Sequence, residues 1–282
     1  MPQIVVTGGL NVDLVVRVPA FPRAGETVLA SCFETVPGGK GANQAVAAAR
    51  LGGDVALIGC VGNDPFGQLL RRSLAEAGVQ ADQVLTVNAP TGVAMIRVDS
   101  LGQNSIVVAP GANDWFRASP QYSGAKIALF QLESPLDQVI AAMSLAKQAG
   151  ALVILDPAPA RPLPPEALSL ADILTPNEVE AEALAESVSL AKSVVYKLGE
   201  HGCRYADSSG SIDVPGFAVT AADTTAAGDC FNGALAVALA EGQSMFTALR
   251  FANAAAALSV TRRGAQPSMP VRAEVEQLLA SS

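Results

Sequence analysis

The stretch KIALFQLESPLDQVIAAMSLAKQAGALVILDPAP, residues 126–159, carries the pattern that decides the fold. It begins and ends with short apolar runs, KIALFQLE and ALVILDPAP, of the kind that form buried parallel strands. Between them, residues 135–149 are rich in alanine and have the length of a helix. A strand, a helix and a second strand in this order predict a βαβ unit.

The same alternation continues along most of the chain. Further apolar runs, each closed by glycine, proline or aspartate, begin at Ile4, Val55, Asp172 and Ser193. Ala-rich helices are expected between the runs, at 43–51, 67–77 and 178–187, and a long apolar helix is expected to end at Gly242. The sequence therefore predicts an α/β fold with a doubly wound, mostly parallel sheet flanked by helices.

Two segments, 13–36 and 91–109, depart from this alternation. They alternate polar and apolar residues, contain turn signals and have no helical pattern. We expect antiparallel strands that lie outside the main sheet as a small β-sheet lid. Since no long linker, low-complexity tract or repeat divides the chain, residues 1–282 are expected to form a single domain.

The composition limits the functions that the chain can have. Half of its residues are hydrophobic and 16% are charged, so a large buried core is expected. The formal net charge of −8 argues against a general nucleic-acid-binding protein, which would carry clusters of Lys and Arg. A bound anion would therefore have to be held locally, by backbone amides or by a metal ion.

Cysteine and histidine usage points to an intracellular protein with few metal-binding options. Four cysteines lie far apart without a metal-ligand spacing, and the single histidine, His201, makes a Ser-His-Asp triad improbable. The N-terminus lacks a signal-peptide pattern. No apolar run reaches the ~20 residues needed to span a bilayer. We expect a cytoplasmic protein that does not bind membranes.

The stretch DTTAAGDCFNGALAVALAEG, residues 223–242, places one acid, Asp229, at the start of an apolar helix. Backbone N–H groups at a helix start form an anion site, and the small residues Ala226, Ala227 and Gly228 would let a phosphate approach them. Asp229 would then lie where a base for an acceptor hydroxyl is needed. A helix-capping acid is the alternative interpretation.

Two other stretches are suited to a hydroxylated ligand. In PGGKGANQAVAAARLGG, from Pro37, a glycine-rich loop leads into a helix, and Asn43 offers both a donor and an acceptor. This loop does not have the spacing of a Walker A motif, and an ordinary glycine-rich helix entry remains open. In GGLNVD, Asn11 and Asp13 share one face of an extended run, as a polyol-binding pair or as part of a turn. The absence of G-x-G-x-x-G after this first strand argues against a nicotinamide dehydrogenase.

Acidic residues follow two further strands. Glu133 comes after one buried strand, and Asn177 with Glu180 comes after another. Asn177 and Glu180 could orient the water shell of Mg²⁺, an ion that keeps several waters and prefers carboxylates together with substrate phosphates. An N-capped helix with acids in its first turn is an equally good interpretation of these two residues.

Taken together, these motifs resemble the ribokinase family of carbohydrate kinases. The resemblance runs from GGLNVD to TRRGAQPSMP, nearly the whole chain, and PGGKGANQAVAAARLGG and DTTAAGDCFNGALA are its most specific regions. It implies a ribokinase-like α/β domain with a β-sheet lid that often joins two subunits, hence a homodimer. It also implies an ATP-dependent sugar kinase that phosphorylates D-ribose at O5. Kinases of deoxyribose, fructose or a nucleoside such as adenosine, and a catalytically silent sugar-binding regulator, remain as alternatives.

The resemblance also implies roles for individual residues. Asp229 becomes the catalytic base, with Ala226, Ala227 and Gly228 as the anion hole. The ribose-binding positions match Asn11, Asp13, Gly39, Lys40, Asn43 and Glu133. The ATP-binding positions match Asn177, Lys197, Leu198, Gly199, Glu200, His201, Gly202, Gly228 and Asn253. A K⁺ site beside the anion hole matches Asp223, Thr225, Ser259, Arg262, Gly264 and Ser268, several of them through carbonyl oxygens, and Mg²⁺ would be held through water by Asn177 and Glu180.

The chain departs from the family pattern on the nucleotide side. The segment between Asn177 and Lys197 is shorter than in most ribokinases, so a helix there is expected to be truncated or lost. Lys197 stands where ribokinases commonly have threonine. The sugar-side residues are all present, so these departures bear on ATP binding alone.

Overall fold

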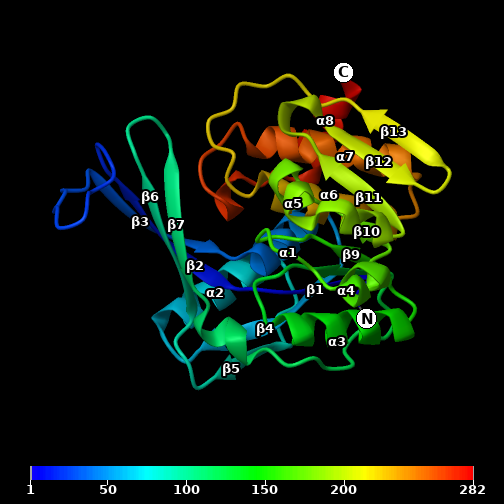
Figure 1. The fold of residues 1–282 in the computed structure, drawn as a ribbon, viewed down its shortest axis with the longest axis horizontal. Helices are drawn as coiled ribbons and strands as arrows, with labels where there is room; N and C mark the ends of the chain where they lie inside the picture. The colour runs from blue at the N-terminus through cyan, green and yellow to red at the C-terminus, as the bar shows by residue number, and fades with distance from the viewer. Residues whose placement is uncertain (1, 282) are drawn as a thin grey trace.

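The computed structural model describes residues 2–281 and contains two β-sheets, one of nine strands and one of four. Figure 1 shows the large sheet surrounded by helices and the small sheet projecting to one side. No helix among residues 2–281 is both long and apolar enough to cross a membrane.

The large sheet is mostly parallel. Its strands are, in spatial order, β13 (Gly210–Val214), β12 (Cys203–Asp207), β11 (Ser193–Lys197), β10 (Ile173–Leu174), β9 (Leu152–Leu155), β8 (Ile127–Phe130), β1 (Ile4–Thr7), β4 (Val55–Gly62) and β5 (Val84–Val87). All neighbours from β11 to β5 pair in parallel, and β12 and β13 add an antiparallel edge. The predicted parallel strands are therefore confirmed, whereas the edge hairpin and β5 were not predicted.

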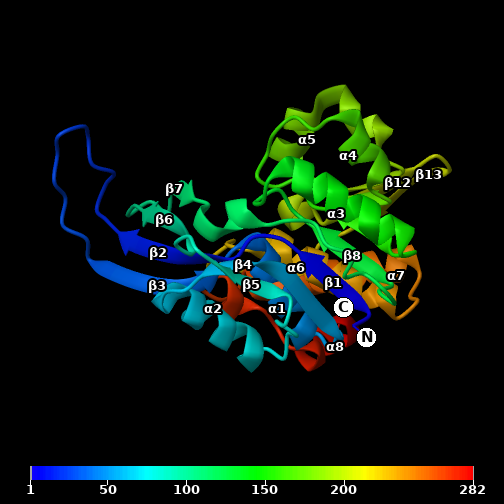
Figure 2. The ribbon, with the colours of Figure 1, turned by 90° about the horizontal axis from the view of Figure 1, so that it is seen from below.

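Helices cover both faces of this sheet (Figure 2). One face carries α1 (Lys40–Arg50), α2 (Pro65–Glu76), α6 (Ala227–Ala240), α7 (Met245–Ser259) and α8 (Arg272–Ala280), and the other carries α3 (Leu136–Gln148), α4 (Pro165–Leu170) and α5 (Glu178–Leu184). Strand side chains alternate between the two cores: Ile4 and Val6 pack into one and Val5 into the other. This alternation confirms the doubly wound α/β fold.

The order of the strands places a ligand-binding crevice at β1 and β8. From the central β1 the chain winds outward through β4 to β5, then returns to β8 on the other side of β1 and winds outward again. In open α/β sheets, ligands bind beyond the carboxyl ends of the strands where the winding direction reverses. The residues that follow β1 and β8 therefore face the expected site.

The small sheet forms the expected lid. Its order is β3 (Cys32–Gly38), β2 (Asn11–Arg17), β6 (Gly92–Val98) and β7 (Asn104–Ala109). The outer pairs are antiparallel, as expected, but β2 and β6 in the centre pair in parallel. The expectation of a wholly antiparallel lid is wrong at this pair, because two hairpins from distant parts of the chain are joined side by side.

The segment between Asn177 and Lys197 holds only short helical elements. The expected helix at 178–187 is α5, which ends at Leu184 and is followed by a 3₁₀ segment, Ala185–Leu190. The chain then enters β11 directly, and Asn177 and Lys197 form a parallel bridge. The ends of the segment are thus adjacent at the carboxyl edge of the sheet.

Candidate active site

Asp229 lies in the first turn of α6 and is buried against α1. Its two carboxylate oxygens accept hydrogen bonds from the side-chain amides of Asn43, at 3.0 Å, and Gln44, at 3.1 Å. Burial raises the pKa of Asp229, while Lys40 and these two amides oppose the rise. The acid is therefore held by side chains from another helix and does not cap its own, so the capping interpretation is excluded.

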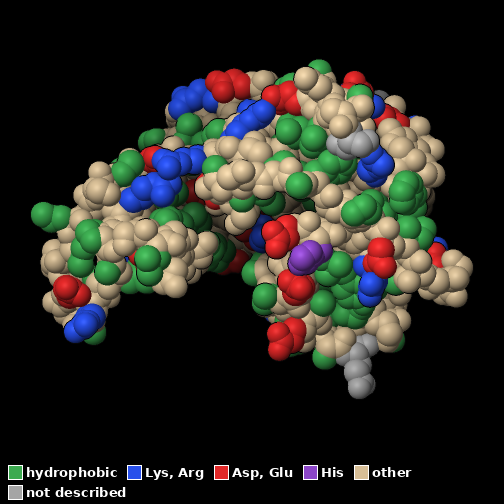
Figure 3. All heavy atoms as spheres, turned by 90° about the horizontal axis from the view of Figure 1, so that it is seen from above, with side chains coloured by type: hydrophobic (Ala, Val, Ile, Leu, Met, Phe, Trp, Pro, Cys, Tyr) green, Lys and Arg blue, Asp and Glu red, His purple; other side chains and the backbone are tan. Residues whose placement is uncertain are grey.

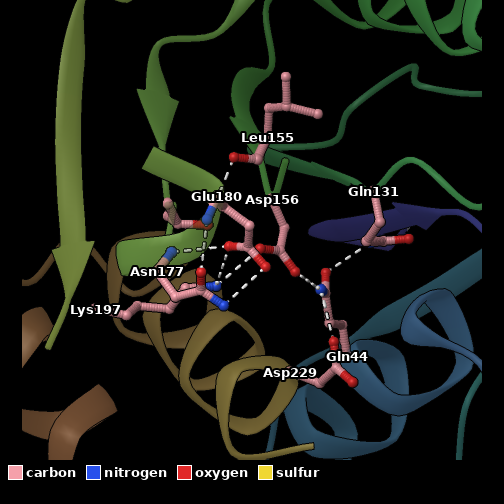
Figure 4. Close-up of polar contacts among 9 residues, drawn as sticks. Gln44, Gln131, Leu155, Asp156, Asn177, Glu180, Lys197 and Asp229 are labelled. Atoms are coloured by element: carbon pink, nitrogen blue, oxygen red, sulfur yellow. Dashed lines mark hydrogen bonds and ion pairs between the residues drawn. The ribbon is translucent and has the colours of Figure 1, made fainter. Parts of the chain in front are cut away.

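Gln44 joins Asp229 to a second buried acid, Asp156 (Figure 4). The Gln44 amide nitrogen also donates to Asp156, at 2.9 Å, and its oxygen accepts from the amide of Gln131, at 2.6 Å. Asp156 follows β9 directly, and all four side chains are nearly inaccessible to solvent. Gln44, Gln131 and Asp156 were not predicted from the sequence; the signal for Asp156 was its place immediately after a strand.

Lys197 continues this network toward the start of α5. Its ammonium lies 2.8 Å from Asp156 Oδ1 and 3.8 Å from Glu180 Oε2 (Figure 4). Glu180 in turn forms a capping box with Asn177 at the start of α5, with reciprocal backbone bonds of 2.8 Å. Burial raises the pKa of Glu180, and Lys197 opposes that rise. The N-capped helix is therefore the observed role of this pair, and the Mg²⁺ role stays a prediction.

The glycine-rich loop before α1 is shaped by close backbone contacts. Gly39 has a φ of 87°, and a Cβ there would lie 2.5 Å from the nitrogen of Asn11. A Cβ on Gly38 would lie within 2.5 Å of the Asp13 carboxylate. The loop is therefore more than an ordinary helix entry, because its glycines let the start of α1 approach the polar residues that follow β1.

Sugar-side residues converge at this loop. Glu133, which follows β8, accepts hydrogen bonds from the Asn11 amide, at 3.3 Å, and from the Lys40 backbone, at 2.7 Å. The side-chain oxygen of Asn11 accepts a hydrogen bond from the side-chain amide of Asn113, at 2.8 Å. Asn113 was not predicted from the sequence. Asp13 is 9% exposed and lies close enough to Glu133 and Asp229 for their charges to act on it. The structure thus brings Asn11, Asp13, Lys40 and Glu133 together near Asp229.

Negative charge dominates this part of the site. Burial, reinforced by nearby carboxylates, raises the pKa of Asp13 to about 7, and burial raises that of Glu133 to about 7. Lys40 is affected in the opposite sense: burial lowers its pKa, but attraction to Asp229, Asp156 and the other acids outweighs burial and raises it. Lys40 is therefore a permanent cation in the middle of an acidic cluster.

The entrance of α6 leaves backbone donors free. Ala226 adopts the left-handed conformation, with φ 59° and ψ 15°, immediately before the helix. The Ala227 N–H donates weakly to Thr224 O, at 3.3 Å, but the N–H groups of Gly228 and Asp229 have no hydrogen-bond partner within residues 2–281. Such free donors, aligned with the helix dipole, can bind an anion.

A cleft of about 490 Å³ separates the lid from the loops around this entrance. Its walls are the inner face of the lid, including Asp13 and Ile96, and the loop segments 221–225 and 263–267. Figure 3 shows the hollow between the lid and the body of the molecule, with charged side chains along its sides. The cleft gives a ligand access to the buried acids from the lid side.

The remaining residues that are predicted to bind the nucleotide are more scattered. Leu198 and the turn Gly199–His201 follow β11 at the carboxyl edge, and Glu200 and His201 are exposed. The Asn253 amide donates to the carbonyls of Val214 and Pro215, and so anchors the loop after β13. A direct contact between Asn253 and a nucleotide stays a prediction.

Only some of the residues predicted to form a K⁺ site are joined by hydrogen bonds. Asp223 accepts hydrogen bonds from the backbone and hydroxyl of Thr225 and, at 3.0 Å, from the backbone of Gly264. The hydroxyls of Ser259 and Ser268 donate to carbonyls of their own turns, at 2.8 and 2.7 Å. The Arg262 side chain pairs with Glu274 on α8 instead of facing this loop. Within the described residues, no cluster of three or more His, Cys, Asp or Glu side chains is arranged to hold a metal directly.

Comparison with known proteins agrees with the fold. A model of the pfkB family of carbohydrate kinases matches residues 1–272. The chain is 45% identical to the ribokinase of Bacillus subtilis over 294 residues, which cover 99% of this chain and all of the relative.

Two solved structures are similar over nearly their whole length. Ribokinase of Arabidopsis thaliana complexed with ribose and ATP has a TM-score of 0.91 and 38% identity, covering 100% of this chain and 99% of that one. Ribokinase from Thermotoga maritima has a TM-score of 0.90 and 40% identity, covering 99% and 100%. The family match and the identity over almost the full length show that this chain belongs to the pfkB family of carbohydrate kinases.

Proposed function

We propose that this carbohydrate kinase transfers the γ-phosphoryl group of ATP to O5 of D-ribose. The observation that carries the proposal is the buried Asp229, whose carboxylate is fixed by Asn43 and Gln44 beside the free N–H groups of Gly228 and Asp229. A base and an anion site in the same helical turn suit phosphoryl transfer to an alcohol. The ribokinases among its relatives, one of them complexed with ribose and ATP, favour ribose as the acceptor.

In this proposal, the residues of the chain position the reactants. Asn11, Asp13, Gly39, Lys40, Asn43 and Glu133 hold the sugar so that its primary hydroxyl faces Asp229. The free backbone donors hold the transferred group. A carboxylate is too weak a base to ionise a free alcohol, so Asp229 accepts the proton late, as the new O–P bond forms. Positioning supplies most of the rate.

Two cations belong to the proposal. The site contains more carboxylates than lysines, and the charge of bound ATP would add to that excess; Mg²⁺, held through water by Glu180 and Asn177, would offset it. A K⁺ beside Asp223 and Thr225 would fix the loop that leads into α6, with carbonyl groups near Ser259, Arg262, Gly264 and Ser268 as further ligands. The hydrogen bonds that already tie Asp223 to Thr225 and Gly264 support a role for this loop in fixing the helix start.

The nucleotide is proposed to lie across the carboxyl ends of β11 and β10. Asn177, Lys197 and the residues from Leu198 to Gly202 would line it, with Asn253 beneath the loop at Pro215. This placement puts the phosphates at α6 and the adenosine at the exposed turn that contains His201. We place the protein in the cytoplasm, where ATP is abundant and where thiols are kept reduced. All four cysteines are unpaired in the described chain, as expected for that compartment.

The substrate assignment is tested by measuring ADP formation with ribose, deoxyribose, fructose and adenosine in turn. We expect the highest kcat/KM with ribose and ribose 5-phosphate as the product, identified by ³¹P NMR. A higher kcat/KM with any other acceptor would refute ribose as the substrate. Turnover of none of them, with ribose still bound, would support a silent regulator.

The role of the base is tested by Asp229→Asn. The substitution should lower kcat by at least about 100-fold, the usual worth of a general base, while ribose affinity measured by calorimetry changes little. Asp137→Asn, at an exposed acid on α3, is the matched control and should retain full activity. Wild-type turnover in Asp229→Asn would show that another group accepts the proton.

We also propose that the lid joins two copies of the chain. Apolar side chains are exposed on both faces of the lid, including Phe33, Met95, Ile106 and Val107, which are 48–62% exposed. Lids carrying this much exposed apolar surface are suited to self-association. Ile106→Glu and Val107→Glu place a charge on opposite faces of β7. The molar mass of each variant, measured by light scattering, should fall to that of a monomer when the charge lies on the face that joins the subunits. Val179→Glu on α5 is the control, and a monomeric wild type would refute the dimer.

A further inference from the structure

Lys197 ends β11 and reaches toward the entrance of α6. Its side chain is 12% exposed, although lysine is rarely buried without an anionic partner. Asp156 is that partner at 2.8 Å, and Glu180, at 3.8 Å, is beyond hydrogen-bonding distance. Asp156 is itself almost fully buried and also accepts from Gln44, so its position is fixed from two directions.

The ammonium lies beside the free backbone donors of α6. A Cβ built on Gly228 would be 3.4 Å from Lys197 Nζ and 4.0 Å from the carbons before it, with no closer neighbour within 4 Å. Gly228 carries one of the N–H groups at this helix entrance that no residue among 2–281 accepts from. A fixed cation and free N–H groups are therefore adjacent at one end of one helix.

The bonding of this ammonium is incomplete. A lysine ammonium has three N–H donors, and within the described residues Asp156 is its one hydrogen-bond acceptor. The remaining donors can therefore serve an anion bound at α6. Because Gln44 links Asp156 to Asp229, a single chain of hydrogen bonds fixes both the cation and the base.

We propose that Lys197 is a catalytic residue that binds the transferred phosphoryl group of ATP, and that Asp156 is the positioning residue that aims it. This inference rests on the proposed function and names a side-chain cation for its anion site. The ammonium stabilises the negative charge that shifts onto the phosphate oxygens during transfer. Asp156 keeps the ammonium at the start of α6.

The variant Lys197→Met removes the charge but leaves Asp156 buried without a cation, which could prevent folding. The double variant Lys197→Met with Asp156→Asn removes both charges and is therefore the main test. Lys197→Arg keeps the charge, and Lys192→Met, at an exposed lysine 77% accessible on the far side of β11, is the matched control.

The double variant should have kcat lower by about 100-fold, as when one oxyanion donor is lost, and an affinity for a non-hydrolysable ATP analogue, which keeps the γ-phosphate, lower by about tenfold or more. Adenosine affinity, measured by calorimetry, and the KM for ribose should each stay within about threefold. Lys197→Arg should recover part of kcat. A purely structural role predicts equal losses of affinity for adenosine and for the ATP analogue, and this result would overturn the proposal, as would an unchanged kcat.

The titrations with the ATP analogue and adenosine need no sugar. If the wild-type chain phosphorylated none of the acceptors, the proposed function would fail, but the selective loss of affinity for the analogue would still support Lys197 as the phosphate-binding cation. If ribose is phosphorylated and the double variant binds the analogue like the wild type, the assignment of Lys197 alone fails.

Discussion

Replacement of Gln44 by glutamate would test the buried network most directly. The Gln44 amide nitrogen donates to Asp156 at 2.9 Å and to Asp229 at 3.1 Å. Gln44→Glu keeps the size and shape of the side chain but replaces two N–H donors by a carboxyl. An ionised carboxylate would then face two others at hydrogen-bonding distance in a site closed to solvent.

The cost can be worked from these distances. At an effective dielectric constant near 20, two like charges about 3 Å apart repel by about 5 kcal/mol, so the two pairs together would cost about 10 kcal/mol. Protonation avoids this repulsion but costs about 1.4 kcal/mol for each pH unit above the usual pKa of ~4.3, so about 5 kcal/mol at pH 8 and about 1 kcal/mol at pH 5. One O–H also replaces two N–H groups, and the lost hydrogen bond to a carboxylate costs about 1.5–3 kcal/mol more.

The variant should therefore be destabilised far more at high pH. The folded state raises the pKa of the new carboxyl, so the destabilisation grows as pH rises above ~4.3. Urea unfolding followed by circular dichroism, from pH 5 to pH 8, should show a variant-minus-wild-type difference that grows by about 4 kcal/mol.

Gln148→Glu, at an exposed position in α3, is the matched control and should show no such growth. If the Gln44→Glu difference were the same at pH 5 and pH 8, the Gln44 amide would not be buried between Asp156 and Asp229 at hydrogen-bonding distance. The network drawn in Figure 4 would then be wrong at its centre.

Two further predictions concern the sugar side and the helix entrance. Burial and nearby acids raise the pKa of Asp13 to about 7. The folded state therefore holds the Asp13 proton more tightly than the unfolded state, and the stability that this proton contributes is fully present below about pH 4 and is lost as pH rises through 7. Thermal unfolding of unliganded Asp13→Asn should therefore depend less on pH between 4 and 8 than that of the wild type, and an equal dependence would contradict the shift. Ala226→Gly should raise the free energy of unfolding by about 1 kcal/mol, because it relieves a left-handed alanine. Ala185→Gly, at the other described alanine with positive φ, should stabilise similarly without affecting turnover, and a loss of stability in Ala226→Gly would contradict the strain.

The sequence alone determined the elements of the large sheet and the candidate base. Alternating apolar runs predicted the parallel strands because burial on both faces leaves a local signature. Asp229, Asn43 and Glu133 stood out because each follows a strand or opens a helix, positions that a short window of sequence reveals. The pairing of β2 with β6 left no such local trace, since it joins hairpins about 80 positions apart.

Tertiary structure alone decided which polar and charged side chains contact one another. Gln44 contacts Asp229 across 185 positions of the chain, and Lys197 contacts Asp156 across 41. The order of the strands brings the ends of β9 and β11 and the start of α6 to one edge, and no local pattern encodes that order. Hydrogen bonds and ion pairs act over a few ångströms of space regardless of separation along the chain. For that reason a residue such as Asp156 acquired a role only once the strands were assembled.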